Sequence, residues 1–194
     1  MKALRSVTGS VAVLDRPDVD TDQIIPKQFL KRIERSGYGE FLFFDWMKDP
    51  VFELHAYPGA SILIAGRNFG CGSSREHAAW ALEDHGFRVV IAPSFGDIFR
   101  TNAIKTGLAP VKLAAADVAR LRAVVETRNE LTVDLEHLVI SHPDGVQISF
   151  AFDAYAQETL VNGLDDIART LLRDDAIAAF ESTHAPRFDA RALA

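Results

Sequence analysis

Residues 66–77 bring together side chains that could bind and deprotonate an acidic substrate. The segment has three glycines, and it carries Ser73, Ser74 and Arg75 directly before a stretch expected to be helical. The N-terminus of a helix offers unpaired N–H groups and about half a positive charge, so it attracts anions. An arginine beside it can bind a carboxylate through two parallel hydrogen bonds. One interpretation is therefore a catalytic loop that binds a di-acid and places Ser73 against an acidic C–H bond.

This chemistry requires strong stabilisation of the alkoxide, because a serine hydroxyl is a poor base at its ordinary pKa. N–H donors, the helix dipole and Arg75 would have to act together. Two other interpretations compete. Ser73 and Glu76 have the spacing of a capping box, in which the two side chains cap each other's backbone N–H groups. A phosphate loop is the other, but the Lys-Ser/Thr ending of a nucleotide loop is missing and the three glycines lack the dinucleotide spacing.

Cys71 lies within the same segment and is the only cysteine of the chain. A nucleophilic cysteine needs a base that is itself oriented by a third group. The spacing of His77 and His85 guarantees contact for neither of them, and no third group can be assigned. A small loop residue is therefore the favoured interpretation. The six histidines show no metal-ligand spacing, and one cysteine cannot hold a zinc ion or an iron-sulfur cluster. We expect no metal and no cofactor in this chain.

A second polar segment, residues 15–22, has four carboxylates in eight positions, which is more than a connection requires. It contains Thr21 and Asp22, and it follows a stretch over residues 5–14 that is typical of a strand. After it, residues 27–35 have a helical pattern. The only basic cluster of the chain lies there, and it is more typical of a solvated helix face than of an anion site.

Composition limits the class of protein. The 194 residues are 48% hydrophobic and 25% charged, with a net charge of -6, which indicates one globular domain with a full core and excludes disorder. The negative charge argues against nucleic-acid binding. No run approaches the roughly 18 apolar residues of a membrane span, and no signal-peptide core follows the N-terminus. We therefore expect a cytoplasmic protein without membrane contact.

Strand and helix patterns alternate along the middle of the chain. The expected strands cover residues 61–65, 89–92, 108–113, 131–135, 138–141 and 146–152. Two expected helices cover residues 75–85 and 117–128. A third has Ser94 as its N-cap, continues to Lys105 and stops at Gly107. The pattern predicts an α/β fold with a mixed sheet flanked by helices. We expect a single domain over residues 1–194, with a core of about residues 1–152 and a helical C-terminal tail of about residues 153–194, broken near Gly163 and Asp174.

Two segments are candidate contact surfaces for another chain. Residues 41–46 are too apolar to face water alone, so they either pack under the neighbouring loop or meet a partner. The C-terminal part is acidic, because residues 113–194 hold 7 basic against 14 acidic side chains. Both surfaces are possible interfaces.

Four segments of this sequence, in order, resemble one family. They are residues 20–26, 66–78, 94–99 and 102–110. With them the chain resembles the small subunits of 3-isopropylmalate dehydratase, which are similar to the swivelling fourth domain of aconitase. The resemblance implies a swivelling β/β/α fold and a hydro-lyase that interconverts 2-isopropylmalate and 3-isopropylmalate through isopropylmaleate, in leucine biosynthesis. It also implies a large subunit as partner, carrying a [4Fe-4S] cluster, and a small di-acid as substrate.

The resemblance also assigns roles to single residues. Ser73 matches the serine that removes and returns the C–H proton, and Arg75 matches an arginine that binds a substrate carboxylate. Asp22 matches an aspartate that lines the site and supports its charge network. The further expected substrate contacts are Thr21, Gly72 and Ser74.

Substrate choice is expected to depend on the segment after Pro26. Phe29, Leu30 and Ile33 could line an apolar pocket for an isopropyl group, and such a pocket would reject a third carboxylate. Lys31 or Arg32 pointing inward would favour a more acidic substrate instead.

Three alternative functions stay open for the whole chain. It could be a related hydro-lyase for another 2-hydroxy di-acid, such as methylmalate or homoaconitate. It could also be a non-catalytic lid over a partner's site, or a hydrolase that uses its cysteine.

Overall fold

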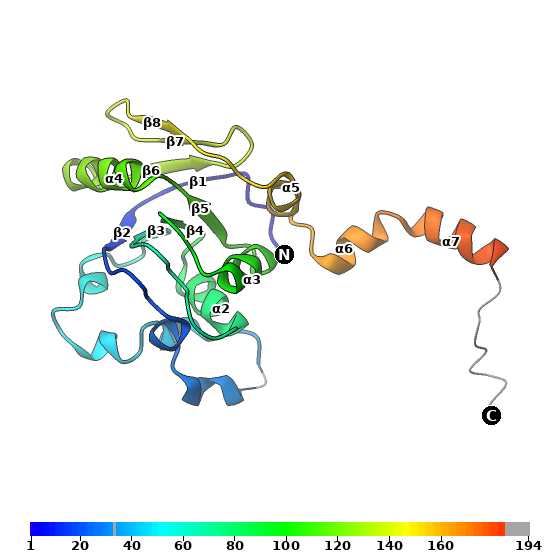
Figure 1. Cartoon of the computed structure of the whole chain (residues 1–194), viewed down its shortest axis with the longest axis horizontal. Helices are drawn as coiled ribbons and strands as arrows, with labels where there is room; N and C mark the ends of the chain where they lie inside the picture. The colour runs from blue at the N-terminus through cyan, green and yellow to red at the C-terminus, as the bar shows by residue number, and fades with distance from the viewer. Residues whose placement is uncertain (33, 185–194) are drawn as a thin grey trace. The chain divides into compact units, whose positions relative to one another are not determined.

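Figure 1 shows the computed structural model of the chain, which describes residues 1–32 and 34–184. The chain divides into two compact units, Met1–Gly163 and Leu164–Ala194. Both β-sheets and both hydrophobic clusters belong to the first unit. The first unit therefore positions the candidate site.

A parallel four-stranded sheet forms the centre of the first unit. Its strands are β2 (Val11–Leu14), β3 (Ile62–Ala65), β4 (Val89–Ala92) and β5 (Ala109–Lys112), in the order β2-β3-β4-β5. Every residue of β3 and β4 is buried, as expected for parallel strands that are covered on both faces. The strands predicted over residues 61–65, 89–92 and 108–113 are thus confirmed to within one residue at each end.

The other sheet is antiparallel and consists of β1 (Ser6–Gly9), β6 (Leu131–Asp134), β7 (Val139–Ser141) and β8 (Gln147–Ser149), in the order β1-β6-β7-β8. The prediction of one strand over residues 5–14 is wrong, because β1 and β2 belong to different sheets. The chain changes sheet at Ser10, whose carbonyl accepts from the N–H groups of Ser61 and Ile62 at 3.1 and 3.2 Å. The α/β class is confirmed, with the parallel and antiparallel pairings in separate sheets.

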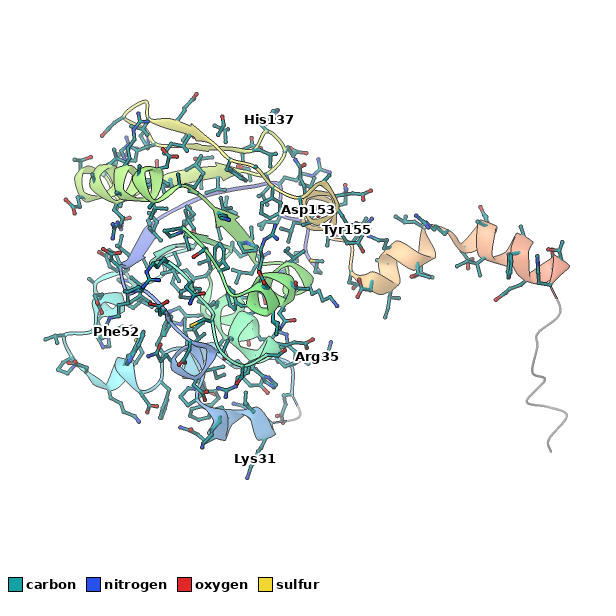
Figure 2. The ribbon with its side chains drawn as sticks, viewed as in Figure 1. Lys31, Arg35, Phe52, His137, Asp153 and Tyr155 are labelled. Carbon is teal, nitrogen blue, oxygen red and sulfur yellow. The ribbon has the colours of Figure 1, made fainter. Side chains whose placement is uncertain are left out.

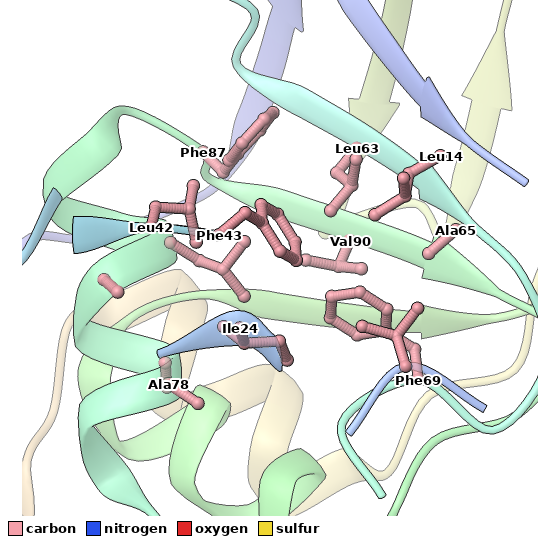
Figure 3. Packing of buried hydrophobic residues seen from close by; sticks show 14 of the residues in the cluster. Leu14, Ile24, Leu42, Phe43, Leu63, Ala65, Phe69, Ala78, Phe87 and Val90 are labelled. Atoms are coloured by element: carbon pink, nitrogen blue, oxygen red, sulfur yellow. The ribbon is translucent and has the colours of Figure 1, made fainter. Parts of the chain in front are cut away.

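The side chains of the parallel sheet alternate between two hydrophobic clusters, as the two-residue period of a strand requires. Leu63 and Val90 pack with residues of α2 and α3, and Figure 3 shows part of this cluster. Ile62 and Ile91 pack with residues of α4 and of the antiparallel sheet. The helices of the first unit are α1 (Thr21–Ile24), α2 (Glu76–His85), α3 (Asp97–Thr106), α4 (Ala115–Thr127) and α5 (Ala154–Asn162).

The apolar segment at residues 41–46 packs on this core. Leu42 and Phe43 are 2% and 0% exposed (Figure 3), and the Trp46 ring stacks on Phe43 with 5.5 Å between the ring centroids. The Arg16 guanidinium also lies over the Trp46 ring, 4.6 Å from its centroid. Of the two expectations for this segment, packing within the chain is the one that the structure bears out.

The second unit has the helices α6 (Asp166–Leu171) and α7 (Asp174–Thr183). The breaks expected near Gly163 and Asp174 are confirmed, because α5 ends at Gly163, which has a left-handed φ of +66°, and α7 begins at Asp174. Asp153 caps the N-terminus of α5. Across the described residues, no helix combines the length and the apolarity that a membrane crossing requires.

Candidate active site

The loop between β3 and α2, residues 66–75, is called the serine loop below. It follows the carboxyl end of a parallel strand, which is where open parallel sheets place their ligand sites. Its Gly70 N–H donates to the Val19 carbonyl in the loop after β2, at 2.7 Å. Its Phe69 N–H donates to the Ser94 carbonyl in the loop after β4, at 3.0 Å. Loops from three adjacent strands therefore meet at the predicted site.

Two glycines allow this close contact between loops. Gly70 and Gly72 have φ angles of +72° and +88°, which is the region that favours glycine. A Cβ atom on Gly70 would also lie 2.2 Å from the Phe99 ring of α3. At Gly72 a Cβ atom would approach the nearest atom, on Asp20, only to 3.4 Å, so the backbone conformation rather than a lack of space requires glycine there.

Helix α2 begins at Glu76, with Arg75 at the N-cap position and no side-chain cap. The capping box predicted for Ser73 and Glu76 is therefore wrong, since Ser73 lies two residues before the cap. A capping box is present instead at α1, where the Asp20 carboxylate accepts from the Gln23 N–H (2.8 Å) and the Gln23 side chain accepts from the Asp20 N–H (2.9 Å). The Asp-x-x-Gln spacing carries this signal in the sequence, and sequence reasoning missed it.

The prediction that Ser94 caps α3 is also wrong. The helix begins at Asp97, and Gly96 occupies the N-cap position. The Ser94 hydroxyl accepts a hydrogen bond of 2.8 Å from the Asn68 N–H in the serine loop. Ser94 therefore joins two loops instead of starting a helix, while the predicted end of that helix at Gly107 is confirmed.

Arg75 and Asp22 form an ion pair across 53 residues of sequence. Both carboxylate oxygens of Asp22 bind the guanidinium, one at Nη1 and the other at Nη2, the second at 2.7 Å. Nη1 also donates to the Ile25 carbonyl at 3.4 Å. Only 12% of the Arg75 side chain is exposed, so the group is held in place. The N–H groups on Nε and on the outer side of Nη2 bind no other described residue.

The carboxylates of residues 15–22 hold this segment against its neighbours. Asp18 accepts hydrogen bonds of 2.9 Å from the side chains of Arg67 and Asn68, at the start of the serine loop. Asp15 pairs with an arginine of α4. The excess of carboxylates noted in the sequence therefore fixes the position from which Asp22 reaches Arg75.

Ser73 and Ser74 are exposed beside Arg75, as is Gly72. The Ser73 hydroxyl has no hydrogen-bond partner among the residues that the structure describes. The Ser73 carbonyl accepts a hydrogen bond of 2.9 Å from the hydroxyl of Thr21, which is only 1% exposed. The structure thus brings Ser73, Ser74, Arg75 and Asp22 together, and it buries Thr21 beneath the serine loop.

The helix predicted over residues 27–35 is wrong, because helical structure covers only the 3₁₀ segment Lys27–Lys31. Basic side chains four residues apart, at positions 27, 31 and 35, repel one another on a helix face and oppose its extension. Phe29 stacks on Phe41 at 4.1 Å between ring centroids, and Leu30 packs against the cluster of α2 and α3. Ile33 lies outside the described residues.

The two cations of this segment differ in their surroundings. Lys31 is exposed and extends away from the fold, as Figure 2 shows. Arg32 donates to Glu40 at 3.3 Å, and its guanidinium lies over the Phe41 ring at 5.1 Å from the centroid. A carboxylate and an aromatic face therefore already occupy Arg32.

His77 lies in the first turn of α2, beside Arg75 in sequence. It is half-buried, with its ring 4.6 Å from the Trp80 ring and 5.1 Å from the Tyr38 ring. Burial lowers the pKa of the imidazole; the Glu76 carboxylate opposes this effect, and the nearby Arg75 adds to it. His77 is therefore neutral at neutral pH and adds no second cation beside Arg75. Within the described parts of the chain, no three His, Cys, Asp or Glu side chains are grouped so that they could hold a metal ion.

Cys71 is partly buried in the serine loop, and its Sγ donates to the Asp18 carbonyl at 3.4 Å. Burial raises the pKa of the thiol, and the carboxylates of Asp20 and Asp18 raise it further. Because the thiolate is the nucleophile, a raised pKa makes the sulfur less reactive at neutral pH. This environment favours the interpretation of Cys71 as a small loop residue.

We expect iodoacetamide to alkylate Cys71 in the folded chain more slowly than in the same chain unfolded in urea, at about pH 8. The thiolate fraction is smaller when the pKa is higher, so the folded-state rate should rise at a higher pH than the unfolded-state rate. Intact-mass spectrometry across a pH series measures both rates. Equal rates in the folded and unfolded chains would contradict the shielded environment of this thiol.

Comparisons with known proteins agree with the resemblance seen in the four segments. Residues 1–116 match the family described as the aconitase C-terminal domain. The 3-isopropylmalate dehydratase small subunit of Bacillus subtilis (strain 168) is 55% identical over 191 residues, which cover 94% of this chain and 96% of that protein. The protein of the same name from Rhodopirellula baltica is 56% identical over 184 residues, which cover 89% and 94%.

A solved structure supports the same assignment at the level of the fold. The crystal structure of 3-isopropylmalate dehydratase from Methanocaldococcus jannaschii superimposes with a TM-score of 0.68 at 26% identity, and the match covers 90% of this chain and 98% of that chain. The predicted α/β architecture and the predicted hydro-lyase class are confirmed by these relatives. The chain therefore belongs to the family of 3-isopropylmalate dehydratase small subunits.

Proposed function

We propose that this chain is the small subunit of a two-component hydro-lyase that interconverts 2-isopropylmalate and 3-isopropylmalate through isopropylmaleate, in leucine biosynthesis. One observation carries the proposal: an exposed serine hydroxyl, Ser73, lies two residues from an anchored guanidinium, Arg75, at the start of a helix. Binding a di-acid requires a cation, and its dehydration requires a proton acceptor. The family membership supports this substrate class. We also propose a cytoplasmic location, and the single cysteine suits that reducing compartment.

Arg75 binds one substrate carboxylate in this proposal. Asp22 already occupies the side formed by Nη1 and Nη2, so the substrate takes the free edge formed by Nε and Nη2. That edge presents two parallel N–H donors, the geometry that suits a carboxylate. Asp22 keeps the guanidinium in position, and the exposed Ser74 and Gly72 complete the carboxylate contacts.

Ser73 moves the proton. In dehydration the deprotonated Ser73 oxygen takes the proton from the C–H bond, the electron pair of that bond forms the double bond, and the substrate hydroxyl leaves from the adjacent carbon with its bonding electrons. The cluster of the large subunit would supply the Lewis acid that accepts this leaving hydroxide. Hydration with the two positions exchanged gives the isomer, and Ser73 returns the proton. The start of α2 and the Arg75 cation stabilise the negative charge on the serine oxygen. Because the Ser73 hydroxyl has no partner among the described residues, it is free to face the substrate.

The large subunit carries the [4Fe-4S] cluster in this proposal. The residues of this chain do not fit a cluster, since it has one cysteine and its described residues contain no group of three metal ligands. This chain contributes the proton-transferring and carboxylate-binding groups instead. Phe29 and Leu30 provide an apolar wall for the isopropyl group in this proposal, while Glu40 and Phe41 occupy Arg32.

The function is tested by an anaerobic assay with the large subunit after cluster reconstitution. The absorbance of the unsaturated intermediate is followed from 3-isopropylmalate, with and without this chain. Activity that requires both chains supports the proposal. If methylmalate or homoaconitate is converted faster than 3-isopropylmalate by the same complex, the substrate assignment is wrong and a related hydro-lyase replaces it.

We further propose that the second unit contacts the large subunit. Its helices have six and ten residues, which is marginal for an isolated helix, and neither contains a buried residue. Ile167, Leu171, Leu172 and Phe180 are 74%, 64%, 70% and 60% exposed. Large exposed apolar side chains concentrated in one short part of the sequence indicate an interface.

We expect the double substitution Leu171→Ser and Phe180→Ser to weaken binding to the large subunit by at least about tenfold, because it removes two apolar contacts. Isothermal titration calorimetry measures the Kd. Val51→Ser is the matched control, since Val51 is 82% exposed in the first unit. Wild-type affinity in the double variant, or an equal loss in the control, would contradict this contact.

A further inference from the structure

Thr21 lies beneath the serine loop and donates two hydrogen bonds to it. Its backbone N–H donates to the Cys71 carbonyl (3.0 Å), and its hydroxyl donates to the Ser73 carbonyl (2.9 Å). The two acceptors lie on either side of Gly72. Because Thr21 is only 1% exposed, a substrate could not reach its hydroxyl unless the loop moved.

The hydroxyl takes the place of a missing backbone donor. Asp20 and Cys71 form a parallel β-bridge, and in a regular parallel ladder the next donor to the Ser73 carbonyl would be the Gln23 N–H. That N–H instead donates to the Asp20 carboxylate at 2.8 Å, because α1 begins at this point. The backbone therefore turns away from the serine loop before it can donate to the Ser73 carbonyl. The Thr21 hydroxyl donates this hydrogen bond instead.

We propose that the Thr21 hydroxyl positions Ser73 for proton transfer, an inference that rests on the proposed role of Ser73. Gly72, with its φ of +88°, gives the loop a conformationally permissive residue directly before Ser73. The Thr21 hydrogen bond fixes the carbonyl on the other side of Ser73, and so fixes the direction of its Cα–Cβ bond. Thr21 is in this view a positioning residue and makes no contact with the substrate.

The test compares Thr21→Val, which keeps the shape and removes the donor, with Thr21→Ser, which keeps the donor. In the assembled enzyme we expect Thr21→Val to lower kcat by about 10–100-fold with KM changed by less than about threefold, since misplacing a reacting group costs turnover. Thr21→Ser should stay within about threefold of wild type. With substrate deuterated at the reacting C–H bond, the isotope effect on kcat should rise in Thr21→Val.

Hydrogen exchange on the chain alone tests the bond without turnover. Thr21→Val should speed exchange of the backbone N–H groups of residues 72–75, and Thr21→Ser should not. An unchanged kcat in Thr21→Val, a loss confined to KM, or equal losses in both variants would overturn the inference. An inactive wild-type complex would instead overturn the proposed function. Thr21→Val could also lose turnover because it unfolds, which a much lower melting temperature would show. In that case Thr21→Ser is the deciding variant: it keeps the hydroxyl, so a loss of turnover in Thr21→Ser would overturn the inference.

Discussion

Ser73→Ala in the assembled enzyme is expected to lower turnover by about 10²–10⁴-fold, the usual contribution of a positioned acid–base group. The substitution removes only a hydroxyl that has no partner among the described residues, so the fold and the Thr21 hydrogen bond to the backbone remain. KM should change little, because Arg75, held in position by Asp22, still binds the substrate carboxylate. Steady-state absorbance of the unsaturated intermediate gives kcat and KM.

Ser74→Ala is the matched control, since Ser74 is the neighbouring serine and is also exposed. It removes a substrate contact but not the proton-transferring oxygen, so its loss should be at least about tenfold smaller. Calorimetric titration should show both variants binding the large subunit with wild-type affinity. Turnover of Ser73→Ala close to wild type would remove Ser73 as the base and leave the serine loop as a binding element only.

Local patterns predicted three of the four parallel strands, β3, β4 and β5, because each is a short apolar run with turn residues on both sides. The runs ending at Ala65 and Ala92 needed no knowledge of their partners, since strands buried on both faces are apolar throughout. The same locality holds for the glycine that ends α3, because one residue with a left-handed φ stops a helix. These features depend on neighbours in sequence alone.

The predictions were wrong where residues distant in the sequence determine the local structure. Nothing within residues 5–14 shows that the Ser10 carbonyl bonds to the chain before β3, so one strand was expected where two sheets begin. Ser73, which one interpretation placed at the cap of α2, lies outside that helix. Its carbonyl accepts a hydrogen bond from Thr21, and the loop after β4 binds the same serine loop at Phe69. The candidate site was predicted from residue types within one segment, and its catalytic role stays a prediction. Its geometry depends on pairs such as Asp22 with Arg75, which periodicity cannot show.

Arg75→Lys is expected to lower kcat/KM by about 10²–10³-fold, because one ammonium cannot replace a guanidinium that serves two carboxylates. In the structure Asp22 takes one side of the guanidinium, and the free edge is left for the substrate. A lysine side chain retains the charge but would bind either Asp22 or the substrate, and it lacks the parallel donors that align a carboxylate. Kinetics with saturating large subunit measure the loss.

Asp22→Asn separates the two contacts of Arg75, because it removes the charge of the partner and leaves the arginine in place. We expect its loss to be smaller than that of Arg75→Lys and to fall mainly on kcat, since the guanidinium remains but is less firmly oriented. A lid without catalytic function predicts the opposite pattern. Under that alternative Arg75→Lys would weaken association with the large subunit and leave kcat/KM of the saturated complex unchanged, and this result would assign the chemistry to the partner.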